Sequence, residues 1–129
     1  LTGNPGDLNN ITGISEAYVR LENSSGTVVH NLADAAIFVH VNPTADFIAS
    51  FISVPTTDLR NRIVTLIIQQ GSTAYIPSSI LVNGFSETVR WNNNTAPAGT
   101  DGQIDVISYS FLRNGSSWII LGQSSSFVQ

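Results

Sequence analysis

The chain has 129 residues, the length of one typical domain, and a formal net charge of −4. Charged residues make up only 11 % of it, compared with about 25 % in an ordinary globular protein. The five basic residues are arginines that do not cluster, which argues against nucleic-acid binding. Cysteine is absent, which excludes disulfides, thiolate nucleophiles and cysteine-ligated metals. No apolar run approaches the ~18 residues that cross a bilayer, so we expect no membrane insertion.

Residues 1–13 are predicted to form an extended arm or linker, because polar, glycine and proline residues follow one another there without periodicity. Residues 14–129 are predicted to form a single β-sandwich domain. Within it, short β-branched segments alternate between apolar and polar positions, as strands do. The expected strands span residues 17–21, 27–30, 37–41, 47–54, 62–69, 80–82, 85–91, 104–113 and 118–121.

Turn-forming residues separate these strands. The pairs Asn83-Gly84 and Asn114-Gly115 tolerate the positive φ angles of tight hairpins. A turn at residues 23–26 suggests that strand 27–30 returns as the hairpin partner of strand 17–21. The pattern predicts an all-β, antiparallel, jelly-roll-like sandwich of roughly eight to ten strands.

Residues 62–68 are nearly continuous in apolar side chains, so both faces of this strand favour burial. We expect one face, with Val64, Leu66 and Ile68, to form a subunit interface. The alternative is a central strand covered by the chain's own loops. Residues 92–103 form a long polar segment, and loops of this length are usually functional or mobile.

The candidate catalytic and metal-ligating residues are few. Alternation places His40 on the same strand face as Phe38, and a hydrogen-bonded or surface histidine is the favoured interpretation for both His40 and His30. Asp101 and Asp105 are expected to cap a turn and to make a structural hydrogen bond rather than to bind a metal. The serines lack the Gly-x-Ser-x-Gly pattern of a nucleophile elbow. We therefore expect no enzymatic activity, no cofactor and no metal.

Aromatic side chains at loop edges suggest a possible carbohydrate site. Trp91 enters the long polar segment and Tyr75 lies near a proline, so these two, with Asn93 and Asn94, are the candidate binding residues. The alternative is that the tryptophan packs on the core with its N–H on a carbonyl.

An ordered series of short motifs resembles a β-rich domain of tailed-bacteriophage virion proteins, particularly the tail-fibre and appendage proteins of cyanophage-like viruses. The resemblance covers residues 47–122. Its motifs are Val54-Pro55-Thr56-Thr57, the strand 63–68, Gln70-Gly71-Ser72-Thr73-Ala74-Tyr75-Ile76-Pro77, Thr88-Val89-Arg90-Trp91, Thr95-Ala96-Pro97, the strand 104–111 and Ser117-Trp118-Ile119-Ile120-Leu121-Gly122. The chain departs from the family at Asn93-Asn94, where a Gly-Gly pair is common.

The resemblance implies a non-enzymatic structural protein of the virion, in a homotrimeric tail fibre or appendage. Its partners would be copies of itself and other virion proteins. A capsid decoration protein and a host-receptor module that binds carbohydrate are the alternatives.

Overall fold

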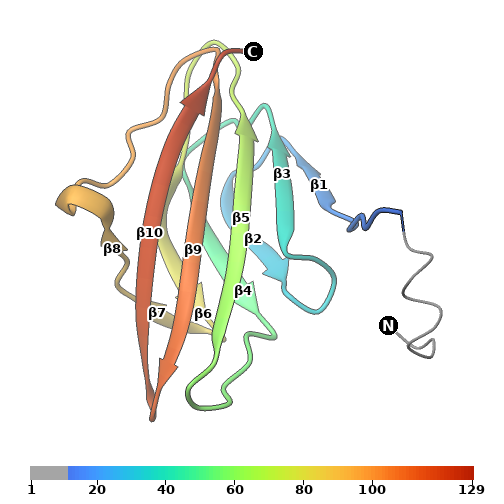
Figure 1. The fold of residues 1–129 in the computed structure, drawn as a ribbon. Helices are drawn as coiled ribbons and strands as arrows, with labels where there is room; N and C mark the ends of the chain where they lie inside the picture. Colours follow the sequence, from blue (N-terminus) through green and yellow to red (C-terminus); the bar gives the residue numbers. More distant parts are fainter. Residues whose placement is uncertain (1–11) are drawn as a thin grey trace.

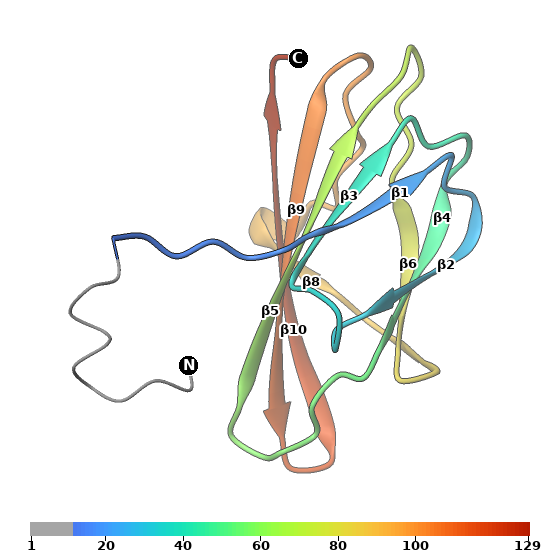
Figure 2. The same ribbon diagram turned by 90° about the vertical axis from the view of Figure 1, so that its right-hand side faces the viewer.

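The computed structural model describes residues 12–129, which form two facing β-sheets (Figures 1 and 2). The first eleven residues of the expected arm lie outside the described part. In spatial order, the six-stranded sheet contains β1 (Val19–Glu22), β3 (Ile37–Val41), β5 (Asn61–Gln69), β9 (Ile104–Asn114), β10 (Ser117–Phe127) and β8 (Arg90–Trp91). The four-stranded sheet contains β2 (Gly26–Asn31), β4 (Phe47–Ile52), β6 (Pro77–Val82) and β7 (Phe85–Glu87). The all-β, sandwich-like architecture is as predicted.

Strand pairing is mixed rather than wholly antiparallel. Strands β1 to β6 alternate between the two sheets, so the neighbours β1, β3 and β5 run parallel, as do β2, β4 and β6. In the described part, five of the eight pairings are parallel. The antiparallel, jelly-roll-like arrangement is therefore not confirmed.

The prediction of a hairpin between residues 17–21 and 27–30 is wrong. Strand β1 pairs with β3, while β2 pairs with β4 in the opposite sheet. Asn23 and Gly26 do adopt the positive φ angles of a turn, 54° and 63°. This turn carries the chain from one sheet to the other instead of folding β2 back onto β1.

Hairpins form at both Asn-Gly pairs, but at the second pair only the glycine has a positive φ angle, because Asn114 ends strand β9 and pairs with Ser117. Asn83 and Gly84 have φ angles of 49° and 89° and join β6 to β7, whose residues Val82 and Phe85 pair directly. Gly115, with a φ of 65°, lies in the turn between β9 and β10. These two long strands form the extended hairpin at the front of Figure 1.

Most predicted strands differ from the observed ones by one to three residues at their ends, and two differ more. Residues 85–91 divide into β7 and β8, which belong to different sheets, because the chain crosses between the sheets at residues 88 and 89. The last strand continues from residue 121 to Phe127, since β9 offers it a partner along its whole length.

The core lies between the sheets and is built from alternate residues of each strand. Its buried apolar side chains are Leu32, Phe38, Phe47, Ala49, Phe51, Val54, Val64, Leu66, Ile68, Ile80, Val82, Ile107, Tyr109, Phe111 and Ile120. The prediction of Val64, Leu66 and Ile68 as a subunit interface is wrong, because all three side chains are 0 % exposed within this core. The outward positions of β5 are instead Ile63, Thr65 and Ile67. Within residues 12–129, no helix has the length and apolar character needed to cross a membrane.

Candidate functional site

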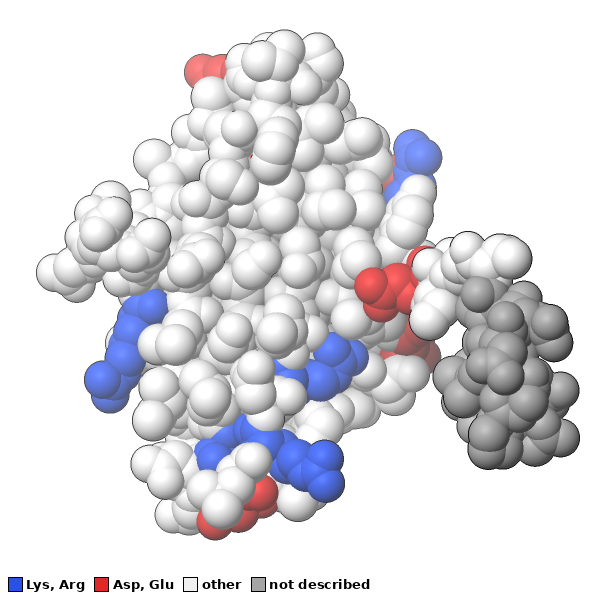
Figure 3. All heavy atoms as spheres, in the orientation of Figure 1, with Lys and Arg blue, Asp and Glu red and all other residues white. Residues whose placement is uncertain are grey.

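A broad, largely apolar surface is formed by the side of the six-stranded sheet that points away from the four-stranded sheet. We call it the outer face and define it by the outward positions of the four central strands. Its members are Ile37, Val39 and Val41 of β3, Asn61, Ile63, Thr65, Ile67 and Gln69 of β5, Ile104, Val106, Ser108, Ser110 and Leu112 of β9, and Ile119, Leu121, Gln123, Ser125 and Phe127 of β10. None of these side chains is charged, and in Figure 3 the upper and central part of this side is white, while basic atoms gather towards its lower end.

Strand register arranges the outer face in rows. Val39, Ile67 and Val106 are direct neighbours across β3, β5 and β9, so they form a continuous aliphatic row. The adjacent row contains Thr65 and Ser108, whose hydroxyl oxygens lie 3.4 Å apart. One aliphatic row and one hydroxyl row therefore lie side by side at the centre of the face, while the neighbouring row of Ile63, Ser110 and Leu121 is mixed. Ile63, Leu121 and Phe127 are the most exposed of its large apolar residues, at 53 %, 46 % and 55 %.

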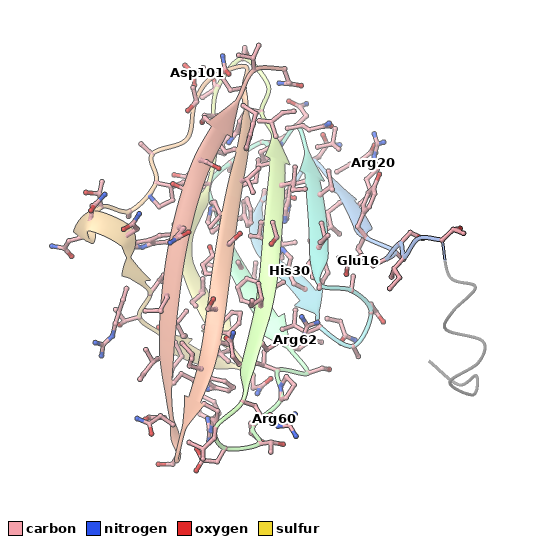
Figure 4. All side chains as sticks on the ribbon, viewed as in Figure 1. Glu16, Arg20, His30, Arg60, Arg62 and Asp101 are labelled. Carbon is pink, nitrogen blue, oxygen red and sulfur yellow. The ribbon has the colours of Figure 1, made fainter. Side chains whose placement is uncertain are left out.

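Charged residues lie at the rim of the outer face. At the β1 edge, Arg20 and Glu22 form an ion pair of 2.9 Å between two exposed side chains. Near the start of β5, the Arg62 guanidinium donates hydrogen bonds to the carbonyl oxygens of Leu32 (3.1 Å) and Ala35 (3.3 Å). The neighbouring Arg60 is exposed, and both arginines lie near the start of β5 (Figure 4). They line a hollow of about 250 Å³. Arg62 therefore has a structural role, whereas Arg60 is accessible to a partner.

The candidate carbohydrate residues are only partly brought together. Trp91 and Asn93 line a hollow of about 390 Å³, whose rim is formed by residues 95–98 and 122–124. Asn94 follows Asn93 on an exposed turn, and both have positive φ angles, 54° and 56°. Tyr75 does not line this hollow.

Trp91 also has a structural role, as the alternative interpretation expected. Its ring packs against buried Tyr109, with 5.8 Å between the ring centroids. It also covers Gly122, where an added Cβ would lie 2.6 Å from the Trp91 ring. The candidate carbohydrate site therefore consists of one edge of the Trp91 ring and the exposed amide groups beside it.

A buried histidine pair lies between the sheets. His30 of β2 and His40 of β3 are both 0 % exposed, and their Nε2 atoms are 2.9 Å apart. The Nδ1 atom of His40 lies 2.6 Å from the hydroxyl oxygen of buried Ser24. Sequence reasoning placed His40 correctly beside Phe38 but missed the pairing with His30, because it depends on contact between strands of different sheets. Burial keeps this trio from reaching a substrate.

Burial also sets the protonation state of the pair. Desolvation lowers the pKa of His30 to about 4, although the nearby backbone of Ser50 and Val28 opposes the shift. Desolvation and the neighbouring His30 lower the pKa of His40 to about 3. Both rings are therefore neutral near pH 7, and the pair is a polar link between the sheets.

Asp105 and Asp101 fix the loops at the other end of the sheet. The Asp105 carboxylate accepts hydrogen bonds from Gln70 Nε2 (2.9 Å), the Thr100 backbone N–H (2.8 Å) and the Ser126 hydroxyl (2.5 Å). Burial opposes ionisation, but these hydrogen bonds outweigh it and lower the pKa of Asp105. Asp101 accepts a hydrogen bond from the Ala74 backbone N–H at 2.7 Å. Both carboxylates make structural hydrogen bonds, in agreement with the sequence-based interpretation.

Comparison with known proteins found no matching family model, no matching curated protein and no matching solved structure. A functional proposal for this chain therefore rests on its own residues and surfaces.

Proposed function

We propose that this chain is a non-enzymatic structural protein of a bacteriophage virion, of the tail-fibre or appendage type, and that it assembles through the outer face of its six-stranded sheet. One observation carries the assembly part of this proposal: the outer face is broad, apolar and uncharged. The resemblance of residues 47–122 to phage virion domains supports the virion context and a trimer. Other virion proteins are the further partners.

The outer face is unusual for a solvated sheet. Sheets with one face in water typically alternate apolar inward residues with polar outward ones. Here the outward positions of β3, β5 and β9 include Val39, Ile67 and Val106 in one continuous row. Removing such a row from water is favourable, and large exposed apolar patches commonly mark protein–protein contacts. The face therefore favours association with another protein surface.

Assembly is tested by measuring the mass of the full chain by light scattering at micromolar concentration. We expect a mass of three chains. A stable monomer at every concentration contradicts assembly, and a stable dimer contradicts the trimer. The outer-face variant Ile63→Asp is expected to reduce the mass, whereas Phe85→Asp, a change at an exposed position of the four-stranded sheet, serves as its control.

The virion context needs a separate experiment. Reconstruction of the particle that contains this chain is expected to place it in a tail fibre or appendage. Density on the capsid surface would favour the decoration alternative, which further predicts that particles without the protein lose resistance to heat. Absence of the chain from any particle would contradict both forms of the proposal.

A host-receptor role is the second candidate, because Trp91 and Asn93 share one hollow. Its test uses Asn93→Gly and Asn94→Gly, which remove the side-chain amides but keep the positive φ angles. A receptor site here predicts weaker binding to host cells. Unchanged binding, with the exposed hairpin variant Asn114→Ala as control, removes these amides from the site.

A further inference from the structure

We propose that residues 12–18 of one copy pack on the outer face of a second copy of this chain. This inference rests on the proposed self-assembly and names the segment that covers the face. It follows from three features of the described residues: an exposed arm, a face suited to an extended segment, and complementary charge at the rim.

Residues 12–18, the arm of this inference, are not covered by any other part of the described chain. Residues 12–18 are all exposed, and Ile14 and Tyr18 are 85 % and 60 % exposed. The arm leaves the sheet at the β1 edge and runs away from its own sheet instead of crossing it (Figure 1). In Figure 2 it projects on the side to which the outer face points. The arm is therefore directed towards whatever molecule lies against that face.

The outer face fits an extended segment. A covered backbone needs partners for its N–H and C=O groups, since an unpaired buried polar group is costly. Thr65, Ser108 and Gln123 are direct neighbours across three strands and offer hydroxyl and amide groups. The adjacent aliphatic row can accept the Ile14 and Tyr18 side chains. An aliphatic row beside a row of hydroxyl and amide groups thus suits a peptide arm better than a wholly apolar partner.

Charge at the rim agrees with this arrangement. Glu16 lies between the two apolar residues of the arm, whereas Arg60 is exposed at the end of the outer face where β5 begins (Figure 4). Among the described residues, the ion pair is between Arg20 and Glu22 and involves neither of these groups. An arm lying along the face of a second copy would bring a carboxylate towards that arginine.

The absence of cysteine allows a direct test by cross-linking, because introduced thiols are the only ones present. Full-length Ile14→Cys is mixed with isotope-labelled, full-length Ile67→Cys under mild oxidation. We expect a disulfide between a labelled and an unlabelled chain, identified by mass. The matched control pairs Ile14→Cys with Phe85→Cys, whose thiol lies exposed on the four-stranded sheet. In this control mixture, we expect the yield of the disulfide between labelled and unlabelled chains to be lower by a factor of about ten or more.

Two results overturn the inference. One is a yield of the disulfide between Ile14→Cys and Ile67→Cys chains that is no greater than the yield between Ile14→Cys and Phe85→Cys chains. The other is a disulfide within a single chain of the double variant Ile14→Cys, Ile67→Cys, which would mean that the arm folds back on its own sheet.

A second measurement separates this inference from the proposed assembly. Because Ile14 is fully outside the core, Ile14→Asp leaves folding intact, and we expect it to weaken association about tenfold by removing one buried side chain. An unchanged assembled mass contradicts the arm contact but leaves assembly through another surface standing. A wild-type monomer contradicts assembly itself.

Discussion

The histidine pair is the buried feature of this protein that responds most directly to pH. Two neutral imidazoles can share one hydrogen bond, with one ring donating and the other accepting. The His30 and His40 rings satisfy this across the two sheets at 2.9 Å. Protonating both rings would place two donors against each other inside a core that also contains Phe38, Phe47 and Phe51. The pair therefore stabilises the sandwich only while it is neutral.

We predict that the free energy of unfolding falls as the pH is lowered from 6 to 5. Both folded pKa values, about 4 and about 3, lie below the unfolded value of 6.5. In this interval the unfolded chain binds protons that the folded chain does not, so acid favours unfolding. Two histidines at up to about 1.4 kcal/mol per pH unit each give a loss of about 2 kcal/mol.

Urea unfolding at a series of pH values, followed by tryptophan fluorescence, measures this loss. The double variant His30→Leu, His40→Leu is the control, because it removes both titrating groups whatever its own stability. Its free energy of unfolding is expected to be nearly constant from pH 6 to pH 5. An equally steep fall in this variant would assign the pH dependence to other groups.

Close packing of β8 on β10 fixes the position of Trp91. Gly122 of β10 pairs with Trp91 of β8, and the indole ring covers the space where a side chain would stand. The backbone at this glycine has no positive φ, so contact rather than conformation requires glycine here. This contact ties the short strand β8, and the polar turn that follows it, to the long hairpin.

We predict that Gly122→Ala lowers the free energy of unfolding by about 1–3 kcal/mol, the usual cost of overpacking. The new methyl group would meet the Trp91 ring at 2.6 Å and a Val89 methyl at 2.7 Å, so the ring must move. Fluorescence in a Trp118→Phe background isolates Trp91 and is expected to shift to longer wavelength. Gly13→Ala, where no atom lies within 4 Å, is the control. An unshifted spectrum with unchanged stability would contradict this account of the β8 contact.

Local patterns predict the strands of this protein better than their partners. Residues 37–41 match β3 in full, and both Asn-Gly hairpins form, because period-two alternation and turn chemistry are local properties. The pairing of β1 with β3 is not local. The same turn at residues 23–26 serves either a hairpin or a crossing between sheets, and only packing of the whole sandwich decides between them.

The inward face of β5 shows a second limit of sequence reasoning. Its two faces carry Val64, Leu66 and Ile68 on one side and Ile63 and Ile67 on the other, so apolarity alone does not say which points inward. The neighbouring strands decide, because Leu66 pairs with Phe38 and Ile107, both buried. The expectation that the strand has two apolar faces was right, but the face assigned to the interface was the wrong one.

At the scale of the whole molecule, the outer face of the six-stranded sheet separates uncharged groups from the charges at its rim. The outer face carries aliphatic, hydroxyl and amide groups, while Arg20 and Arg60 lie at its rim (Figure 4), as does Arg90, the neighbour of Leu121. Association through such a face draws its free energy from the burial of apolar area and only marginally from ion pairs, since an exposed pair contributes about 0–1 kcal/mol. The salt dependence of assembly therefore reports which surface is used.

We predict that the association constant changes by less than about fivefold between 0.05 M and 1 M sodium chloride, because salt screens only the rim charges. Sodium sulfate is expected to strengthen association, since it favours burial of apolar surface. Analytical ultracentrifugation of the full chain across this range measures both effects. Arg60→Gln should remove most of the remaining salt dependence, with Glu87→Gln, a change on strand β7 of the four-stranded sheet, as its control. Dissociation by 1 M sodium chloride would mean that charged surfaces hold the copies together, and the outer face would then not be the principal contact.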